Sequence, residues 1–283
     1  MTITVAIVAP GEMGSGIGGV LAAAGAEVLT SLAGRSPASA ARAQANGMRG
    51  ASDEEIAAAD IVLSILPPRD AVAMAERLAP ALARSRRPVY ADCNAVSPQT
   101  VWRVAEIVTA TGCRFADGGI IGLPPEPPEP GPKLYVSGPD AAALTPLRDL
   151  GLDLRVLDAP VGAASALKMS YAGITKGMTA ICTAMILGAI RNGAGPDLAR
   201  ELADSQQATL KRVSTTIPNM FPKAYRWVGE MREIAAFLGE EDAAHLMYEG
   251  ASGLYDHIAQ DREGDGADLA ALQQFLRQAN GKK

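Results

Sequence analysis

Residues 1–161 alternate between short apolar runs and longer segments with helical periodicity. Apolar or β-branched runs of strand length occupy residues 2–8, 27–32, 61–67 and 88–94. Helical patterns lie between and after them, at residues 14–24, 36–48, 70–84 and 97–112. Strands that alternate with helices in this way are typical of βαβ units, which form a mostly parallel sheet covered by helices.

Three further strand patterns, at residues 114–122, 133–138 and 154–157, complete the first part of the chain. From Gly162 onward the pattern changes, because residues 163–191 predict one long helix and the remainder up to Lys283 is helical. We therefore predict an α/β fold, a Rossmann-type doubly wound parallel sheet over residues 1–161. An all-α domain over residues 162–283, begun by the long interdomain helix, follows it.

Composition and charge narrow the class of protein. The net charge is −5 and no long basic run occurs, so we expect no nucleic-acid partner. The three cysteines are widely spaced, which fits neither a disulfide framework nor a metal site, so we predict no metal. Residues 177–190 are uncharged but shorter than the roughly 20 residues that span a bilayer, and the N-terminus lacks a signal-peptide pattern. We expect a cytoplasmic protein with no membrane partner.

A glycine-rich turn follows the first predicted strand in the segment "VAIVAPGEMGSGIGG". Ala9, Gly11 and Gly14 take the three positions of the dinucleotide-binding fingerprint, with Glu12 and Met13 between the two glycines. A glycine at position 11 lets the backbone approach a pyrophosphate, and a glycine at position 14 permits close packing of helix on strand. The turn therefore predicts a nicotinamide dinucleotide site, although the same pattern can form a turn without a ligand.

The end of the second predicted strand distinguishes NAD from NADP. An NAD site has an acidic residue there to bind the ribose 2′-hydroxyl, and the segment "TSLAGRSPAS" contains none. Arg35 can pair with a 2′-phosphate, and Ser31 and Ser36 can donate hydrogen bonds to it. We predict NADP(H) as cofactor, with NAD less favoured. The alternative is that Arg35 is a solvated loop residue and Ser36 a helix N-cap.

Five segments in order resemble the β-hydroxyacid dehydrogenase superfamily, which includes 3-hydroxyisobutyrate and 6-phosphogluconate dehydrogenases and, more distantly, imine reductases. They are "APGEMG" (9–14), "ADIVLSILPP" (59–68), "DCNAVSP" (92–98), "DGGIIG" (117–122) and "GAASALK" (162–168). The helical part, through "RWVGEMREIAAF" (226–237), resembles a branch of this superfamily with an all-helical C-terminal domain.

The resemblance implies roles for individual residues. Leu66 and Pro67 are expected beside the nicotinamide and Asn94 beside its ribose, while Lys168 takes the position of the family's catalytic lysine. Residues 117–122 take the place of the substrate-carboxylate loop. This sequence departs from the family at Ala172, where an Asn is common, and at residues 121–123, where Ile-Gly-Leu replaces Ser-Gly-Gly.

Lys168 carries the predicted chemistry. A hydride that reaches a carbonyl carbon leaves negative charge on oxygen, which an ammonium can stabilise and protonate. In the oxidative direction the neutral amine takes the hydroxyl proton, and burial lowers the pKa of a lysine toward neutrality. A lysine on an apolar helix more commonly extends to solvent or forms a salt bridge, and that reading is the alternative.

Several neighbours are candidate substrate contacts. Tyr171 and Thr175 lie on the same helical stripe as Lys168 and can offer hydroxyl groups, or else pack in the core. The strand end Gly118–Ile120 can present backbone N–H groups to a substrate oxygen, although its glycines can equally serve a tight bend. We assign Asp117 a structural role. His245 and His257 we also assign to structure.

These observations predict an NADP(H)-dependent oxidoreductase that moves a hydride between nicotinamide and a small hydroxy acid or secondary alcohol. Lys168 would act as general acid or base. An imine reductase is the alternative within enzymes, since Tyr171 keeps C=N chemistry open. A cofactor-binding regulator without turnover is the alternative outside them. We also expect a homodimer through the helical domain, because the long apolar helix presents more surface than one chain can cover.

Overall fold

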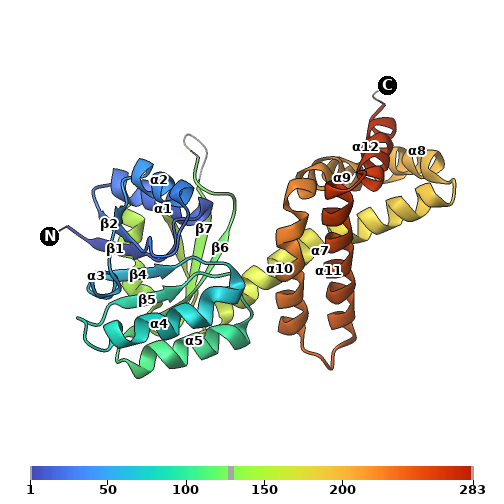
Figure 1. The fold of residues 1–283 in the computed structure, drawn as a ribbon. Helices are drawn as coiled ribbons and strands as arrows, with labels where there is room; N and C mark the ends of the chain where they lie inside the picture. The colour runs from blue at the N-terminus through green and yellow to red at the C-terminus, as the bar shows by residue number, and fades with distance from the viewer. Residues whose placement is uncertain (1, 127–130, 282–283) are drawn as a thin grey trace. The chain divides into compact units, whose positions relative to one another are not determined.

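The computed structural model describes residues 2–126 and 131–281, which divide into two compact units (Figure 1). The first unit is Met1–Met169 and the second is Ser170–Lys283. The division falls inside helix α7 (Ala163–Arg191), eight residues beyond the boundary expected from the sequence. The reason is that the first turn of α7 packs on the sheet of the first unit, while the rest of the helix belongs to the second.

The first unit is built on one eight-stranded sheet in the order β3-β2-β1-β4-β5-β6-β7-β8. Neighbouring strands are parallel except β6 and β7, which pair antiparallel. The doubly wound, mostly parallel sheet predicted from the sequence is therefore confirmed. The strands are β1 (Thr4–Ile7), β2 (Glu27–Thr30), β3 (Arg49–Gly50), β4 (Ile61–Ser64), β5 (Val89–Asp92), β6 (Arg114–Ile121), β7 (Lys133–Ser137) and β8 (Asp153–Val156).

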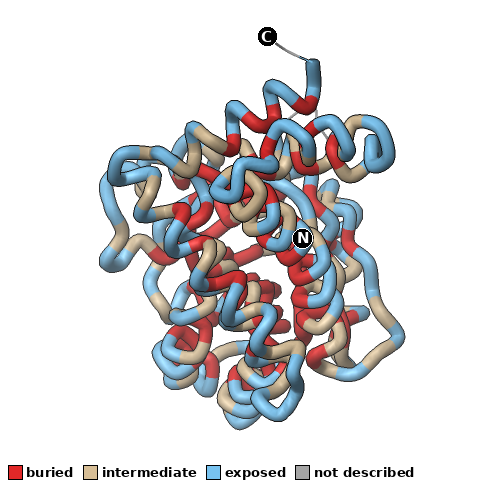
Figure 2. Tube along the Cα trace, turned by 90° about the vertical axis from the view of Figure 1, so that its right-hand side faces the viewer, coloured by how far each residue is buried: buried red, intermediate tan, exposed pale blue. Residues whose placement is uncertain are grey.

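Helices cover both faces of this sheet. One buried apolar cluster joins one face to α3, α4 and α5, and a second joins the other face to α1, α2 and α6. The apolar strands are buried on both faces, as parallel strands between two helical layers must be (Figure 2). The helices are α1 (Glu12–Ala23), α2 (Pro37–Ala45), α3 (Asp53–Ala57), α4 (Ala71–Leu82), α5 (Pro98–Ala110) and α6 (Pro146–Asp149), with short 3₁₀ turns at Pro68–Asp70 and Ala141–Leu144.

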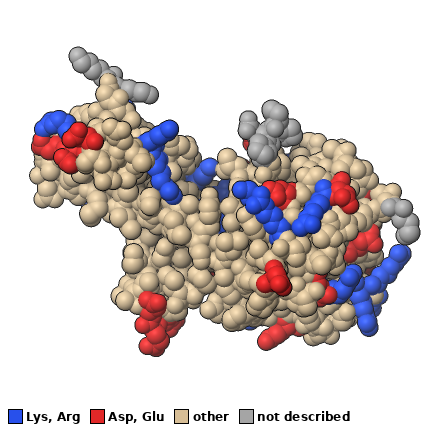
Figure 3. Space-filling model, turned by 180° about the vertical axis from the view of Figure 1, so that it is seen from behind, with Lys and Arg blue, Asp and Glu red and all other residues tan. Residues whose placement is uncertain are grey.

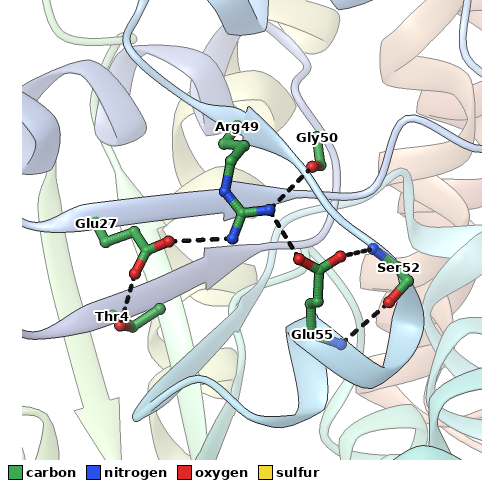
Figure 4. A network of polar contacts seen from close by, with 6 residues as sticks. All are labelled: Thr4, Glu27, Arg49, Gly50, Ser52 and Glu55. Carbon is green, nitrogen blue, oxygen red and sulfur yellow. Dashed lines mark hydrogen bonds and ion pairs between the residues drawn. The ribbon is translucent and has the colours of Figure 1, made fainter.

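The edge strand β3 was not predicted, because its two residues carry no apolar pattern. Polar side chains hold it instead (Figure 4). Arg49 bonds Glu27 on β2 at 3.1 Å and Glu55 on α3 at 2.8 Å. Ser52 and Glu55 form a reciprocal capping box at the start of α3. The backbone hydrogen bond from Ser52, and then the bond from Arg49, lower the pKa of Glu55.

On the face drawn in Figure 3, charged side chains form small groups, some of one sign and some of both. Several are ion pairs between close neighbours in sequence, such as Arg155 with Asp153 and Arg200 with Asp197. Exposed pairs of this kind contribute about 0–1 kcal/mol each to stability. The stability of the fold therefore rests on its apolar clusters.

The second unit is helical throughout its described residues. It contains the rest of α7, then α8 (Gly195–Ser205), α9 (Gln207–Met220), a 3₁₀ turn (Phe221–Lys223), α10 (Ala224–Leu238), α11 (Ala243–Glu263) and α12 (Ala267–Ala279). Helices α10 and α11 pack along each other as a helical hairpin. Gly173 and Gly177 on α7 leave room for the Tyr248 ring of α11, since an added Cβ would lie 3.0 Å and 3.3 Å from its atoms.

A half-buried ion pair fixes α7 to α10 in this unit. The Lys176 ammonium pairs with Glu230, and it also lies 4.9 Å from the centre of the Trp227 ring. The Tyr255 hydroxyl of α11 donates a 2.6 Å hydrogen bond to the Lys176 carbonyl, and its ring meets Trp227 edge to face. Burial, and then the nearby charge of Glu230, raise the pKa of Tyr255.

Helix α7 is long and apolar enough, by length and composition alone, to cross a membrane. Its most apolar 18-residue window has a mean hydropathy of 1.5, and 39% of that window is buried inside the protein. The uncharged run of residues 177–190 alone is shorter than a bilayer span, whereas the whole helix is longer, and one such helix is weak evidence for a membrane span. A soluble core helix can meet the same criteria.

Candidate cofactor and active site

The glycine turn lies between β1 and α1 at the carboxyl edge of the sheet. Gly11 is the N-cap residue of α1, with extended backbone angles. An added Cβ on Gly14 would lie 2.2 Å from the Ala9 carbonyl oxygen, so only glycine lets the helix begin so close to the strand. A Cβ on Gly11 would meet no protein atom within 4 Å. Open space beside a helix N-terminus suits a pyrophosphate, whose charge the N–H groups and the helix dipole favour.

Glu12 and Met13 form the first turn of α1, Glu12 exposed and Met13 half-buried against the apolar cluster. Arg42 of α2 reaches this turn from the next crossover, since its guanidinium donates a 3.1 Å hydrogen bond to the Pro10 carbonyl. Sequence reasoning missed Arg42, because it lies 32 residues from Pro10 and no local pattern connects the two. Its cation lies beside the position expected for the phosphates.

The end of β2 carries the residues predicted to distinguish NADP from NAD. Ser31 is 3% exposed and accepts a 3.3 Å hydrogen bond from the Arg77 guanidinium of α4, which is also paired with Asp53 at 2.7 Å. Arg35 is half-buried in the loop that follows. Arg77 is a second residue that the sequence did not reveal, because it lies 46 residues from Ser31.

Ser36 is the N-cap of α2, where its hydroxyl accepts a 3.2 Å hydrogen bond from the Ser39 backbone N–H. Ser36 is therefore a helix N-cap, which was the alternative prediction for this residue, and its hydroxyl is already bonded within the protein. The N-terminus of α2 nevertheless lies at the end of the β2 loop, one residue after Arg35. The loop therefore presents a cation together with a helix N-terminus.

Asn94 connects the ends of β4 and β5. Its side-chain oxygen accepts a 2.5 Å hydrogen bond from the Leu66 backbone N–H, and its amide nitrogen donates to the Ser64 hydroxyl at 3.0 Å. Asn94 is 2% exposed and Leu66 is 8% exposed, whereas Pro67 is exposed. The Asn94 side chain thus holds the Leu66–Pro67 turn in place, in addition to any contact with a nucleotide ribose.

Strand β6 places Gly118 and Gly119 at the carboxyl edge of the sheet. They pair with Val136 and Tyr135 in a continuous strand, so the reading of these glycines as a tight bend was wrong. A Cβ on Gly119 would lie 2.6 Å from the Ala164 carbonyl oxygen and 3.2 Å from the Lys168 Cβ. Gly119 is therefore a glycine because the first turns of α7, including Lys168, lie directly on it.

The neighbouring residues of β6 are also packed. A Cβ on Gly118 would lie 2.7 Å from the Cys93 sulfur. Ile120 is 6% exposed and its side chain belongs to the apolar cluster on the α1 face of the sheet. A contact of Gly118–Ile120 with substrate stays a prediction.

The carboxylate of Asp117 holds the start of α7. Its Oδ2 accepts hydrogen bonds from the Gly162 and Ser165 backbone N–H groups, both at 3.0 Å, and from the Ser137 hydroxyl at 3.1 Å. Its Oδ1 accepts a 2.6 Å bond from the Ser165 hydroxyl. The Ser137 hydroxyl in turn accepts from the Ala164 backbone N–H at 3.0 Å. Asp117 is fully buried. These contacts support the structural role that we assigned to it from the sequence.

A second buried carboxylate, Asp92, lies opposite Asp117 on the neighbouring strand β5. Its Oδ1 accepts a 2.9 Å hydrogen bond from the Asn94 backbone N–H, and its buried Oδ2 makes no hydrogen bond within the described residues. Burial raises the pKa of Asp92 to about 7, and the charge of Asp117 adds to the shift. Burial also raises the pKa of the Cys93 thiol, and the charges of Asp92 and Asp117 raise it further.

Lys168 is half-buried, one turn beyond Ser165 on α7. Tyr171 and Thr175 follow on the same helix but belong to the helical unit. Tyr171 is 51% exposed, and the Thr175 hydroxyl donates to the Tyr171 carbonyl at 2.9 Å. Their contact with substrate stays a prediction.

The histidines have partners within the helical unit. His245 contacts the Ala235 carbonyl through Nδ1 at 2.9 Å, and His257 pairs with Asp268 at 2.7 Å. Burial acts to raise the pKa of Asp268, but His257 and Arg191 outweigh it and lower that pKa overall. Within residues 2–126 and 131–281, no group of three or more His, Cys, Asp or Glu lies close enough to hold a metal ion.

Comparison with known families agrees with this arrangement. Residues 4–147, just over half of the chain, match the NAD binding domain of 6-phosphogluconate dehydrogenase. The chain belongs to the β-hydroxyacid dehydrogenase-like superfamily. Its first unit is an NAD(P)-binding Rossmann domain. Residues 189–258 of the helical unit match a domain of unknown function.

Two relatives of this superfamily member have no established function. An uncharacterised 28.5 kDa protein of Methanothermus fervidus is 26% identical over 235 residues, which cover 82% of this chain and 90% of that protein. A conserved protein of unknown function, whose structure is described as similar to 3-hydroxyacid dehydrogenases, is 27% identical with a TM-score of 0.71. The match covers 92% of this chain and 98% of that structure.

More distant structures share the fold. The 3-hydroxyisobutyrate dehydrogenase of Mycobacterium tuberculosis is 18% identical, with a TM-score of 0.65 and coverage of 99% of both chains. An imine reductase of Myxococcus stipitatus, solved with NADP⁺, is 17% identical, with a TM-score of 0.54 and coverage of 96% of this chain and 99% of that one. The superfamily member described here thus has the fold of NAD(P)-dependent dehydrogenases and reductases.

Proposed function

We propose that this protein is an NADP(H)-dependent oxidoreductase that interconverts a small hydroxy acid or secondary alcohol and its carbonyl compound, with Lys168 as general acid and base. When bound, the nicotinamide cofactor accepts or supplies the hydride. The observation that carries the proposal is the position of Lys168 on Gly119, at the carboxyl edge of the sheet. Ligands of open α/β sheets bind at that edge.

The register of the sheet places the predicted parts of the site along one edge. Ile7, Leu63, Ala91 and Ala116 lie side by side across β1, β4, β5 and β6. The glycine turn, the Leu66–Pro67 turn, Asn94 and Gly119 all come two to seven residues after that row. A dinucleotide that has its pyrophosphate on Gly11 and runs along this edge would have its nicotinamide near Leu66 and Gly119.

In this geometry the Lys168 ammonium would donate a hydrogen bond to the carbonyl oxygen of the substrate. It stabilises the negative charge that develops on that oxygen and then gives it a proton. In the oxidative direction the neutral amine removes the hydroxyl proton. Gly118–Ile120, Tyr171 and Thr175 remain our candidates for substrate contact, and Ile121 and Leu123 favour an apolar substituent.

A substrate panel tests the proposal. Purified protein is assayed with hydroxy acids, secondary alcohols, carbonyl compounds and cyclic imines, and NADPH absorbance is followed. Replacement of Lys168 by Ala should lower kcat by about 10²–10⁴-fold, the usual contribution of a general acid or base, while NADPH binding is kept. Full activity of the Lys168→Ala variant would contradict the proposed mechanism.

The cofactor preference is a separate proposal, supported by the end of β2. Ser31, Arg35 and the N-terminus of α2 follow one another in the loop after the strand, and that loop contains no acidic side chain to bind a 2′-hydroxyl. Arg35→Glu should shift the ratio of NADPH to NADH efficiency by about tenfold or more toward NADH, because it removes a charge-assisted bond to the 2′-phosphate. An unchanged ratio would refute NADP(H) selection by this loop.

Imine reduction is the second candidate. It is supported by the exposed Tyr171, one turn from Lys168, and by the fold shared with imine reductases. In that case cyclic imines in the panel would be turned over, and Tyr171→Phe would lower kcat more than Lys168→Ala. A third possibility, a regulator without turnover, predicts NADPH binding and no activity with any compound of the panel.

We also propose that the protein is a cytoplasmic homodimer joined through its helical unit. The support is a row of exposed apolar side chains along α7, which we call the α7 row: Tyr171, Ile174, Met178, Ile181 and Met185. Their spacing of three and four residues puts them on one face of the helix. A second copy, with the same row, is the occupant that we propose for this face.

A further inference from the structure

The start of α7 is held in an unusual way. The first N–H groups of a helix have no partner within the helix, and commonly a nearby Ser, Thr, Asp or Asn caps them. In α7 the capping groups come from strands distant in sequence, Asp117 on β6 and Ser137 on β7, directly opposite each other in the sheet. The sequence separation is 45 residues between Asp117 and Gly162.

Asp117 is suited to this task as a carboxylate. It receives four hydrogen bonds, two from backbone N–H groups and two from serine hydroxyls, and is itself fully buried. An ionised carboxylate offers about four acceptor sites on two oxygens, whereas an asparagine has one acceptor oxygen and an NH₂ group. The charge also complements the positive end of the helix dipole.

These bonds fix the orientation of the turn that carries Lys168. Ser165 gives Asp117 both its backbone N–H and its hydroxyl, so the helix can neither slide nor rotate at this residue without breaking two bonds. Lys168 follows Ser165 by three residues, nearly one turn, and its Cβ lies above Gly119. The positions of Ser165 and Gly119 together define the direction in which the lysine side chain leaves the helix.

We propose that Asp117 is the positioning residue of Lys168: through Ser165 and the first turn of α7, its carboxylate sets where the lysine amine lies. The inference rests on the proposed catalytic role of Lys168 and adds a residue that does not itself touch substrate. A displacement of about 1 Å in a reacting group can lower the rate by about 10²-fold, so such positioning has a measurable effect.

Two variants and a matched control test this role without any substrate. Asp117→Asn removes acceptor sites, and Ser165→Ala removes only the 2.6 Å bond to Oδ1. Asp140→Asn is the control, because the Asp140 carboxylate also accepts a backbone N–H, that of Phe115, which lies on β6 and not on α7. Acetylation of Lys168 is followed against pH by peptide mass spectrometry, with Lys176 as internal reference. Hydrogen exchange of the peptide containing residues 162–169 is measured in parallel.

We expect the midpoint of the Lys168 labelling profile to move by about one pH unit in Asp117→Asn and less in Ser165→Ala, since the surroundings of the amine change. Exchange of the first turn of α7 should become faster in both, and Asp140→Asn should change neither. If Asp117→Asn does not fold, Ser165→Ala still gives both readouts. A profile that stays unchanged in Ser165→Ala and in any folded Asp117→Asn, whatever the melting temperature, overturns the proposal.

Kinetics separate this proposal from the one on which it rests. With a substrate from the panel, Asp117→Asn should lower kcat by about 10²-fold with little change in the KM for NADPH. If Lys168→Ala loses activity while Asp117→Asn and Ser165→Ala keep the wild-type rate and pH profile, the positioning role fails and the catalytic role stands. If Lys168→Ala keeps full activity, the catalytic role fails.

Discussion

The two units of the chain hold their buried or half-buried carboxylates in different ways. In the nucleotide-binding unit, Asp117 is held by hydroxyl and backbone N–H groups, with Asp92 beside it on the next strand. In the helical unit, Glu230 is held by the ammonium of Lys176, which itself lies over Trp227. A carboxylate neutralised by a cation ties two helices together. A carboxylate surrounded by N–H and hydroxyl groups fixes the direction of the groups that bind it.

Burial of carboxylates in the nucleotide-binding unit predicts a response to pH, and the largest effect is at Asp92. Its pKa in the folded state is about 7, above the ordinary value of 3.8. The folded state therefore keeps a proton that the unfolded state loses, so the stabilisation is complete below about pH 4 and is lost as pH rises through 7. The loss between those limits is on the order of 3–4 kcal/mol for the nucleotide-binding unit.

Asp92→Asn should remove this pH dependence. Urea unfolding is followed at several pH values between 4 and 8 in a Trp227→Phe background, in which Trp102 reports on the nucleotide-binding unit alone. Asp153→Asn is the control, because the hydrogen bond from Arg155 lowers the pKa of Asp153 and leaves it ionised over most of this range. A wild-type stability that is flat from pH 4 to 8 would contradict a neutral Asp92.

The ion pair of the helical unit should give a smaller effect. Glu230→Gln leaves the half-buried Lys176 ammonium without its carboxylate and should lower the free energy of unfolding by about 1–2 kcal/mol, less than a fully buried pair because solvent reaches both groups. Trp227 fluorescence in a Trp102→Phe background measures this change in the free energy of unfolding. The double variant Lys176→Met, Glu230→Leu should lose less than Glu230→Gln, and an equal or larger loss would show that the pair is not what stabilises this site.

The sequence predicted the nucleotide-binding unit well and the helical unit only in outline. Strands β1, β2, β4 and β5 are nearly continuous apolar runs, and Gly14 is required by a contact within five residues, so local patterns reveal both. The contacts of Arg77 with Ser31 and of Asp117 with Ser165 join residues 46 and 48 positions apart. No local period records such pairs, so the sequence assigned Asp117 a structural role without revealing which groups bind it, and the role of Lys168 stays a prediction.

The smallest effect on folding is expected at the α7 row, which is a set of exposed apolar side chains on the helical unit. Ile181→Glu replaces a side chain that is 55% exposed, so monomer stability should change by no more than about 0.5 kcal/mol. The same change places a charge in the proposed contact between two copies and should shift the protein from dimer to monomer in light scattering. Leu246→Glu is the control, because Leu246 is also exposed, at 70%, but lies on α11 outside the row. A monomeric wild type would overturn the proposed dimer.

The close approach of Gly119 to α7 has a consequence for redesign of this protein. A library that varies residues 118 and 119 would yield mainly variants in which helix α7 is displaced, since even a methyl group at position 119 collides with the Ala164 carbonyl. Residues 121 and 123 offer more freedom, because Ile121 is only half-buried and Leu123 is 73% exposed. Efforts to alter the compounds accepted under the proposed function should therefore begin at the end of strand β6 and in the residues that follow it.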